Sequence, residues 1–583
     1  MHAPGAGVKR RARRPLDVTP AARSFARVTQ PKASLTGSRV GVAARSRRGF
    51  LRVLVLVAAA AARVAAQQPG ATTVPGLGTL TFPTSTLVPA AQEAFIRGVL
   101  LLHVFHYPQA ADVFRQAQQL DPGLALAYWG EALTHTHQVW NQQDAAQGRL
   151  VLSKLGPTPT ARAAKAPTAR ERAYLDAVEI LYGEGPKARR DTLYAVAMGQ
   201  LATSYPGDDE ARLFYAVSLL GLNQGVRDVP TFLRAAAIAE SVFTRNPAHP
   251  GAAHYWIHGM DDPDHAAQAL PAARALGAIA SSAAHAQHMT SHIFVALGMW
   301  DDVVSANERA THGHQMFCGH LNLFLQYGYI EQGRLAEARR LMAGCRDQAP
   351  KMAAMMKPGP RDLYADDVVT MWSRYLLDTG DWAGEVARWS VDPDGLPASG
   401  LSYWFARGFG AVRQGKLAAA RVALTAFEQA RQAIATQVPR DGADPTPEER
   451  AFLTRADVLR LELVGLIETS AGNRTAALDT LRRAVAVEDG MPYTFGPPFV
   501  DEPSRELLGE QLLAAGQPQE ARNAFEAGLR RTPGRASVLL GLARVAEALG
   551  DTRGARRAYG DLAAIWHGAD ADLPWLAEAR RSR

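Results

Sequence analysis

The stretch EPSRELLGEQLLAAGQPQEARNAFEAGLRRTPGR, residues 502–535, carries the pattern that decides the fold. Small residues that let two helices approach closely alternate with large ones that fill the remaining gaps. The marks are small residues at positions 8, 20 and 27, an aromatic at 24 and a proline at 32: Gly509, Ala521, Gly528, Phe525 and Pro533. A pair of helices built this way cannot bury its apolar face alone, so several pairs must stack.

The same marks recur along the chain, as a repeat architecture requires. Units start at residues 91, 319, 401 and 536, the last one directly after residue 535. The first unit has all five marks: Gly98, Ala110, Phe114, Ala117 and Pro122. A chain of 583 residues is too long for one ordinary compact domain, whereas a repeat array has no such limit. We therefore predict an all-α solenoid of helix-turn-helix repeats.

This pattern resembles the tetratricopeptide repeat family, over most of residues 90–570. The resemblance implies an α-α superhelix in which the first helix of each unit lines a concave groove with its positions 2, 5, 9 and 13. We expect an N-terminal array at 90–355 and a C-terminal array at 356–570, with loops at 156–167 and 438–447. A linker at 67–89 and a basic tail at 571–583 complete the expected organisation.

The N-terminal segment resembles a twin-arginine export signal. Its marks are the sequence SRRGFLR at residues 46–52, a short apolar stretch at 53–62, and Val64-Ala65-Ala66 as a cleavage signal. The apolar stretch is too short for a stable membrane anchor. We expect residues 1–66 to be an extension plus signal peptide, and the mature protein to be periplasmic or secreted, without a membrane span. The alternative is a chance arginine pair before an apolar helix.

Charge and cysteine content narrow the function classes. Residues 1–63 hold 14 of the 64 basic residues and one of the 56 acidic ones, which leaves 50 basic and 55 acidic residues beyond them. The body of the chain therefore has no nucleic-acid signature. The two cysteines, Cys318 and Cys345, imply no disulfide framework.

Histidines form the most distinctive cluster: ten of the 16 lie in residues 249–320. The turn glycines Gly298 and Gly333 set repeat units that start at 284 and 319, and one unit earlier at 250. In this register six histidines take groove positions on three successive first helices: His254, His258, His285, His288, His292 and His320. Side chains three or four residues apart on a helix are neighbours, and packed helices lie about 8–10 Å apart. The six rings are therefore expected to converge on a shared point.

Imidazole is a common ligand of Zn, Cu, Fe and Ni. We predict a transition-metal site, Zn or Cu first, with Fe or Ni not excluded. Aspartates 261, 262 and 264 follow His258 and are expected to orient the rings. Cys318 is either a further ligand or, as we favour, a small loop residue. The alternatives for the cluster are a polar groove that binds ligand carboxylates without metal, or no special role.

The same register places other polar side chains in the groove. They are His103, Glu131, His137, Asp262, Glu506 and Glu510. Glu506 and Glu510 lie one turn apart and are acid/base residues, metal ligands, hooks for a basic ligand, or simply solvated charges. The aromatic loop Tyr493–Pro498 precedes them and is expected to cap the groove.

Two functions compete at this point. The resemblance implies a scaffold that binds a peptide, protein or small ligand in its groove. The histidine placement favours a metal-binding protein, or a metal-dependent enzyme such as an oxidoreductase or hydrolase. The sequence contains no HExxH pair, glycine-rich phosphate loop or nucleophile elbow that would name a reaction.

Overall fold

The computed structural model describes residues 70–223, 226–311, 318–355, 362–393, 396–437 and 445–581. Residues 67–583 form one compact unit. The expected signal peptide at 1–66 lies outside the described residues, as does most of the expected loop at 438–447.

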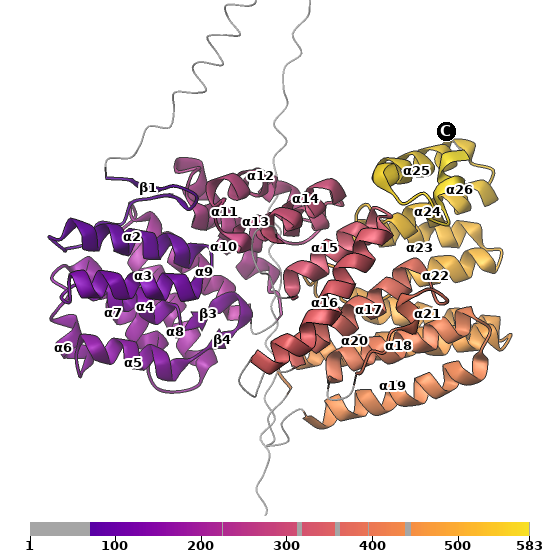
Figure 1. Cartoon of the computed structure of the whole chain (residues 1–583), viewed down its shortest axis with the longest axis horizontal. Coiled ribbons are helices and arrows are strands. Elements are labelled where there is room, and N and C mark those ends of the chain that lie inside the picture. Colours follow the sequence, from indigo (N-terminus) through magenta and orange to yellow (C-terminus); the bar gives the residue numbers. More distant parts are fainter. Residues whose placement is uncertain are drawn as a thin grey trace, which may run out of the picture. The chain divides into compact units, whose positions relative to one another are not determined.

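The described chain is built almost wholly of helices, joined as consecutive antiparallel pairs (Figure 1). The first part contains β1 (Thr72–Val74), β2 (Gly78–Leu80), α2 (Pro89–His103), α3 (Tyr107–Leu120), α4 (Ala125–Leu133), β3 (Thr136–His137), η1 (Gln138–Trp140), β4 (Gln142–Gln143), α5 (Ala145–Leu155), α6 (Pro159–Ala163), α7 (Ala169–Leu181), α8 (Lys187–Ser204), α9 (Asp209–Leu220), η2 (Gly221–Asn223) and α10 (Val229–Arg245). The histidine-rich part contains α11 (Pro250–Gly259), η3 (Ala266–Ala269), α12 (Leu270–Ile279), α13 (Ala284–Ala296), α14 (Trp300–Thr311), α15 (His320–Glu331) and α16 (Leu335–Met355). The last part contains α17 (Asp362–Thr379), η4 (Val386–Arg388), α18 (Pro397–Arg413), α19 (Leu417–Gln437), α20 (Pro447–Ser470), α21 (Arg474–Asp489), α22 (Ser504–Ala514), α23 (Pro518–Arg531), α24 (Ala536–Ala548), α25 (Thr552–Ile565), η5 (Trp566–Gly568) and α26 (Leu576–Arg581).

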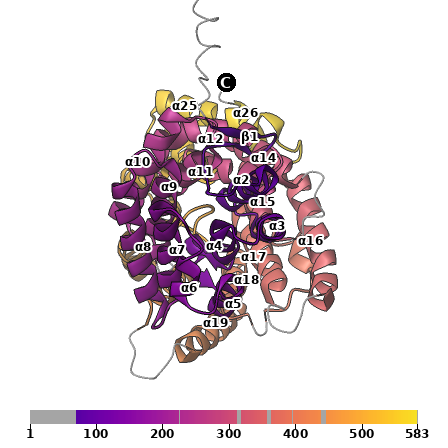
Figure 2. The same ribbon diagram turned by 90° about the vertical axis from the view of Figure 1, so that its left-hand side faces the viewer.

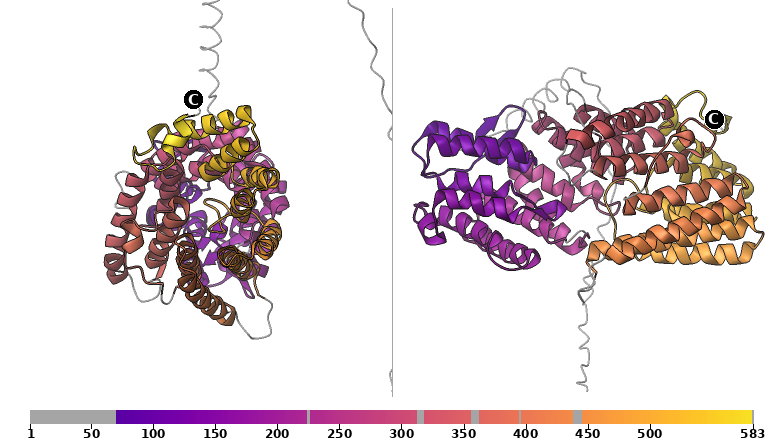
Figure 3. Two further views of the ribbon diagram at one scale, coloured as in Figure 1. Left: turned by 90° about the vertical axis from the view of Figure 1, so that its right-hand side faces the viewer. Right: turned by 60° about the horizontal axis from the view of Figure 1, so that its bottom comes forward.

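The predicted all-α repeat fold is confirmed, and the packing follows the sequence pattern. Phe525, the aromatic mark of the 502–535 unit, is almost fully buried. It lies between Gly509 of its own pair and Gly541 of the next pair, where an added Cβ would come within 2.9 Å and 2.5 Å of the ring. Glycine at position 8 of one unit and at position 6 of the next therefore lets one ring pack against three helices. Figure 3 shows the resulting stack of paired helices at the C-terminal end, in orange and yellow.

The predicted repeat register also agrees with the structure in the histidine-rich part. Units expected to start at 250, 284 and 319 correspond to helices that start at Pro250, Ala284 and His320. Gly298 and Gly333, from which the register was set, both adopt a φ of +67° in the turn between the two helices of their pair. Glycine takes this left-handed conformation without the strain that other residues would suffer.

Several short segments depart from the expected organisation. Residues 67–89, expected as a linker, contain the antiparallel pair β1–β2, and Leu80 and Phe82 are buried. Thr79 donates its backbone N–H to the carbonyl of Ala248, directly before α11, so this ribbon anchors a histidine-bearing helix. The expected loop at 156–167 contains α6, and the expected tail contains α26, which packs on α25.

Repeats that are far apart in the sequence also contact one another in this array. The indole Nε1 of Trp300, at the start of α14, donates to the carbonyl of Gly534, 2.7 Å away. Asp570, after α25, accepts from the backbone N–H of Ala336 and donates its own N–H to the carbonyl of Gly333. In a simple solenoid each repeat contacts only its neighbours; here the α13–α16 region is also held by residues more than 200 positions away.

Among the described residues, no helix combines the length and the apolar character needed to cross a bilayer.

Candidate metal centre

The six predicted histidines lie on α11, α13 and α15, the first helices of three successive pairs. In Figure 1 the labels of α11 and α13 are adjacent and that of α15 lies to their right; Figure 2 shows α11 and α15 again from another side. The six histidines gather in two groups of three instead of around one point. We call His254, His258 and His285 the first triad, and His288, His292 and His320 the second triad. Within each triad the nearest ligand atoms all lie within 4.8 Å of one another. The triads adjoin, since the ring centroids of His258 and His292 are 6.2 Å apart.

Each ring of the first triad has an unpaired nitrogen. The Nε2 atoms of His254, His258 and His285 are buried and have no hydrogen-bond partner among the residues that the structure describes. His254 donates its Nδ1 proton to the backbone carbonyl of His103, 2.7 Å away, so its Nε2 must carry the free lone pair. A buried polar atom without a partner is unfavourable by about 1–3 kcal/mol. Three such atoms directed into one small space fit a cation that binds all of them.

The surroundings of the first triad keep its imidazoles neutral. Burial lowers the pKa of His254 to about 3, and burial together with the neighbouring histidines lowers the pKa values of His258 and His285 well below the usual value. Neutral imidazole is the form that binds metal.

The ring of Phe105 forms a wall of the first triad, with its centroid 4.4 Å from that of His254. The backbone of Phe105 has a φ of +57°. Such a conformation is rare for a bulky residue and tends to occur at functional sites. In this protein the backbone conformation of Phe105 places an aromatic ring, and not a further polar group, against the histidines of the first triad.

In the second triad two lone pairs face each other. His288 donates its Nδ1 proton to the Oδ1 of Asn307, 2.7 Å away, and His292 donates its own to the Oδ2 of Asp261, 2.6 Å away. The amide of Asn307 is oriented by its other end, which donates to the carbonyl of Val303. When both rings are neutral, both Nε2 atoms are therefore acceptors, yet they are 3.1 Å apart. Two imidazoles on one tetrahedral zinc would place their nitrogens about 3.3 Å apart.

Asp261 and Asn307 thus fix the orientation of these two rings, as hydrogen-bond partners of histidine ligands do in known metal sites. The expectation that an aspartate after His258 orients a ring is met in geometry by Asp261. No sequence pattern pointed to Asn307, because it lies on α14, the second helix of its pair.

The second triad has an open side. His320, at the start of α15, is exposed, and its ring centroid is 4.8 Å from that of His288. The predicted aromatic loop reaches this side, with the ring centroid of Phe495 5.5 Å from that of His292. Gly496 of the loop has a φ of +90°, and an added Cβ there would come within 2.5 Å of Phe324. A loop from the C-terminal part of the chain therefore covers one edge of the triad.

His103 belongs to neither triad, although its repeat position suggested the same groove. Its Nε2 bonds the Oε2 of Glu210 at 2.7 Å, and the other carboxylate oxygen bonds the Nε2 of His249 at 2.8 Å. The hydroxyl of Tyr255 donates to the Nδ1 of His103. Burial favours a neutral Glu210, but His249 and His103 outweigh it and lower the pKa of this carboxyl to about 2. These three residues hydrogen-bond one another, so the cluster needs no ion. The partner Glu210 was not predicted.

Three other predicted groove residues are bound elsewhere. Glu131 of α4 is buried, accepts from Gln118 and pairs with the half-exposed side chains of Arg115 and Lys154. His137 is on strand β3 and not on a first helix, because α4 ends at Leu133, and it stacks on Tyr107. Asp262 pairs with Arg227 at 2.7 Å and accepts from His265. None of the three is part of a triad. The remaining pair, Glu506 and Glu510, lines a separate cavity near the C-terminal end.

Cys318 and Cys345 form a disulfide, with their Cα atoms 5.2 Å apart. The cysteine count had implied no disulfide framework, and this single disulfide was not predicted; it also means that Cys318 is no thiolate ligand. The bond joins the residue two positions before His320 to α16, so it fixes the start of α15.

Replacing both cysteines by serine is expected to lower the free energy of unfolding by about 3 kcal/mol, because the bond closes a loop between residues 27 positions apart. Urea denaturation of the two proteins measures this difference. Dithiothreitol should lower the stability of the parent protein to that of the variant and leave the variant unchanged. A parent protein insensitive to the reductant would contradict the prediction.

A family model described as tetratricopeptide repeat matches residues 512–565. No curated protein sequence matches the chain.

Solved structures similar to the chain include the human IFIT1 dimer with m7Gppp-AAAA, at 12% identity and a TM-score of 0.34, covering 84% of this chain and 92% of that one. The APC/C hetero-tetramer Cut9-Hcn1 (13% identity, TM-score 0.26, 84% and 95% covered) and yeast Tom70 (11% identity, TM-score 0.26, 80% and 90% covered) are also similar. With TM-scores below 0.5, these similarities say nothing about what this chain binds. The paired helices of the described residues and their repeat marks form an all-α solenoid of helix pairs, and the family match identifies residues 512–565 as tetratricopeptide repeat.

Proposed function

We propose that this protein binds transition-metal ions at its two histidine triads. The observation that carries the proposal is the set of three buried, unpartnered Nε2 atoms of His254, His258 and His285. Hydrogen bonds within the described residues satisfy the His103–Glu210–His249 cluster, but they leave these atoms unpaired. An all-imidazole ligand set suits Zn or Cu first, and Fe or Ni also.

The proposed setting is the periplasm or the cell exterior. The twin-arginine-type leader supports export, and the Cys318–Cys345 disulfide agrees with an oxidising compartment. Under this proposal the protein is a tetratricopeptide scaffold whose partner is a peptide, a protein or a small ligand, with no role in nucleic-acid binding.

A metal-dependent enzyme is the second candidate, and one observation favours it. Catalytic metal sites use three protein ligands and keep a further position open, whereas structural sites are closed. The second triad offers three imidazoles and is exposed at His320. An oxidoreductase or a hydrolase fits this arrangement, with the loop around Phe495 beside the open position.

Metal analysis of the full chain, exported by its own route, tests the proposal. We expect about two transition-metal ions per chain by mass spectrometry. His258→Ala should remove the ion of the first triad and His288→Ala that of the second, while the exposed His567→Ala serves as the matched control. Added Zn or Cu at a hundredfold excess over Kd should stabilise the metal-free protein by about 2.7 kcal/mol for each triad that it occupies.

A metal-free exported protein whose melting temperature does not respond to Zn, Cu, Fe or Ni would overturn the proposal. If metal binds but neither oxidation nor hydrolysis of model substrates depends on His320, the scaffold function stands without the enzyme.

A further inference from the structure

A second site lies away from the histidines, in the C-terminal half of the chain. Helices α15, α17, α18, α22 and α24 surround a cavity of about 620 Å³, and the segment around Trp566 and Trp575 closes one side of it. Ligand pockets for small molecules are typically about 300–1,000 Å³.

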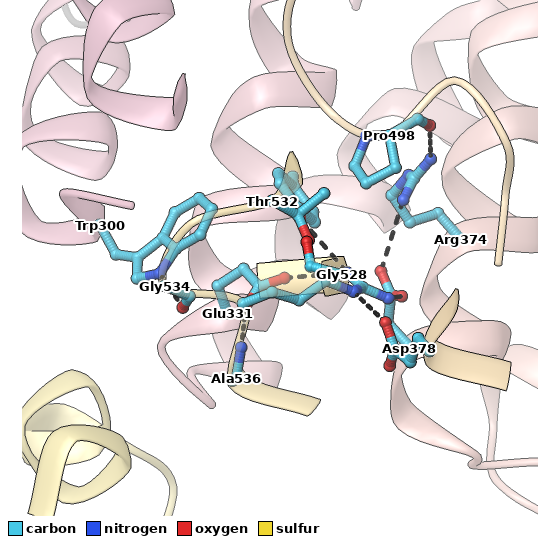
Figure 4. A network of polar contacts seen from close by, with 12 residues as sticks. Trp300, Glu331, Arg374, Asp378, Pro498, Gly528, Thr532, Gly534 and Ala536 are labelled. Carbon is cyan, nitrogen blue, oxygen red and sulfur yellow. Dashed lines mark hydrogen bonds and ion pairs between the residues drawn. The ribbon is translucent and has the colours of Figure 1, made fainter. Parts of the chain in front are cut away.

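Most of the acidic side chains of this cavity already have a cationic partner. Arg535, before α24, donates to Glu506 at 2.5 Å, to Glu331 at 3.0 Å and to Asp378 at 2.8 Å. Part of this network, around Glu331 and Asp378, is drawn in Figure 4. Glu510 pairs with Arg413 of α18. These carboxylates are therefore structural, and they are not free to hold a ligand alone.

Glu502 differs from its neighbours. It lines the cavity and is only 4% exposed, but no hydrogen bond or ion pair links its carboxyl to any residue that the structure describes. Burial raises the pKa of Glu502 well above its usual value, and the nearby Glu506 and Glu510 raise it further. A buried carboxyl without a partner is unfavourable. A cation placed beside Glu502 would offset the cost of burying the carboxyl and would lower its raised pKa. Arg535 opposes this rise in pKa, but neither it nor any other cation of the described residues forms an ion pair with Glu502.

Four aromatic side chains form part of the remaining wall, which also contains aliphatic residues and the side chains of Arg413 and Arg544. The guanidinium of Arg413 lies over the Phe409 ring, 4.8 Å from its centroid. Trp382, Phe409, Trp566 and Trp575 line it together with the carboxyls. An ammonium or guanidinium group is attracted to aromatic faces as well as to carboxylates. A hard divalent metal ion prefers several oxygen ligands and gains nothing from aromatic walls. Only one carboxyl of this cavity is unpaired among the described residues.

We infer that this cavity binds a small organic cation with an ammonium or guanidinium group, which pairs with Glu502 between the aromatic side chains. The site is independent of the histidine triads and does not require the protein to hold a metal.

Calorimetric titration of the full chain with cadaverine and agmatine tests the inference, with 1,5-pentanediol as an uncharged analogue of cadaverine. We expect saturable binding of at least one cation and none of the diol. Glu502→Gln keeps the shape of the side chain and should weaken binding at least tenfold. Glu526→Gln is the matched control: it makes the same charge change on the exposed face of α23 and should bind within twofold of the parent.

Trp575→Leu is a second variant in case Glu502→Gln does not fold, and it should also weaken binding at least threefold. Binding should persist in His258→Ala and His288→Ala proteins, which separates this site from the proposed metal sites. The inference is overturned if neither cation binds, if Glu502→Gln binds within threefold of the parent, or if Ca²⁺ or Mg²⁺ binds in a Glu502-dependent way in place of the organic cations.

Discussion

Replacing Arg535 with methionine is expected to lower the free energy of unfolding by about 3–5 kcal/mol, the usual effect of removing one partner from a buried ion pair. Arg535 is 1% exposed and holds three buried carboxylates, from Glu331 on α15, Asp378 on α17 and Glu506 on α22. Its loss leaves Glu331 and Glu506 without an ion pair among the described residues, and leaves Asp378 with only the longer contact to Arg374, at 3.7 Å. Whole domains are stable by only about 5–15 kcal/mol, so this variant should be close to unfolding at growth temperature.

Burial disfavours the charged form of a carboxyl around Arg535 even in the parent protein. Burial raises the pKa of Glu331 to about 7 although Arg535 lies beside it. The second oxygen of Glu331 accepts the backbone N–H of Ala536 at 2.7 Å, at the start of α24, as Figure 4 shows. The pair therefore ties α15 to a helix about 200 positions later, and the loss should loosen contacts between distant repeats.

Urea denaturation measures this effect, with Arg482→Met as the matched control. Arg482 makes exposed ion pairs with Asp479 and Glu520, so its replacement should change stability by less than about 0.5 kcal/mol. Arg535→Lys keeps the charge but cannot reach three carboxylates with a planar fork, and should fall between the two. A loss of under 1 kcal/mol for Arg535→Met would show that the three carboxyls are accommodated in another way.

The sequence predicted the repeat fold and its local register well, because both depend on short-range spacing. Gly298 and Gly333 mark turns whose φ of +67° suits glycine, and counting from them placed the six histidines on three first helices. Spacing along a helix determines which face a side chain shares with its neighbours. The same reasoning placed the loop around Phe495 before α22, and the structure brings this loop to the second triad.

Pairings between distant residues were beyond this reasoning. His103 occupied a groove position as plausible as that of His254, and only the partners distinguish them: His103 bonds Glu210, 107 positions away, whereas the Nε2 of His254 has no partner. The Cys318–Cys345 bond depends likewise on how α15 and α16 pack. His137 was misplaced because α4 is shorter than a standard repeat helix and a two-stranded turn follows it.

Metal-free protein is expected to lose stability steeply between pH 7 and pH 5. The folded-state pKa of His254 is about 3, lowered by burial, whereas an unfolded histidine titrates near pH 6.5. In this pH window the unfolded chain binds a proton that the folded chain does not, so stability falls as pH falls. At pH 5 the loss from His254 alone is about 2 kcal/mol. His258, His285 and His288 have pKa values lowered in the same direction and add to it.

The measurement is urea denaturation in the presence of a chelator at pH 7.5 and pH 5, on the parent and on His254→Leu. Carboxyl groups such as Glu331 also titrate between pH 7 and pH 5, but their protonation in the folded state raises stability as pH falls. The test is therefore the difference between the variant and the parent, because the curve of the parent alone contains both effects. The stability difference between the two pH values should be smaller by about 2 kcal/mol in His254→Leu, because one histidine no longer takes up a proton on unfolding. His567→Leu, at an exposed position, should leave the difference unchanged. If His254→Leu has the pH dependence of the parent, the ring of His254 is protonated in the folded state at pH 5, and the buried neutral imidazole on which the first triad depends does not exist.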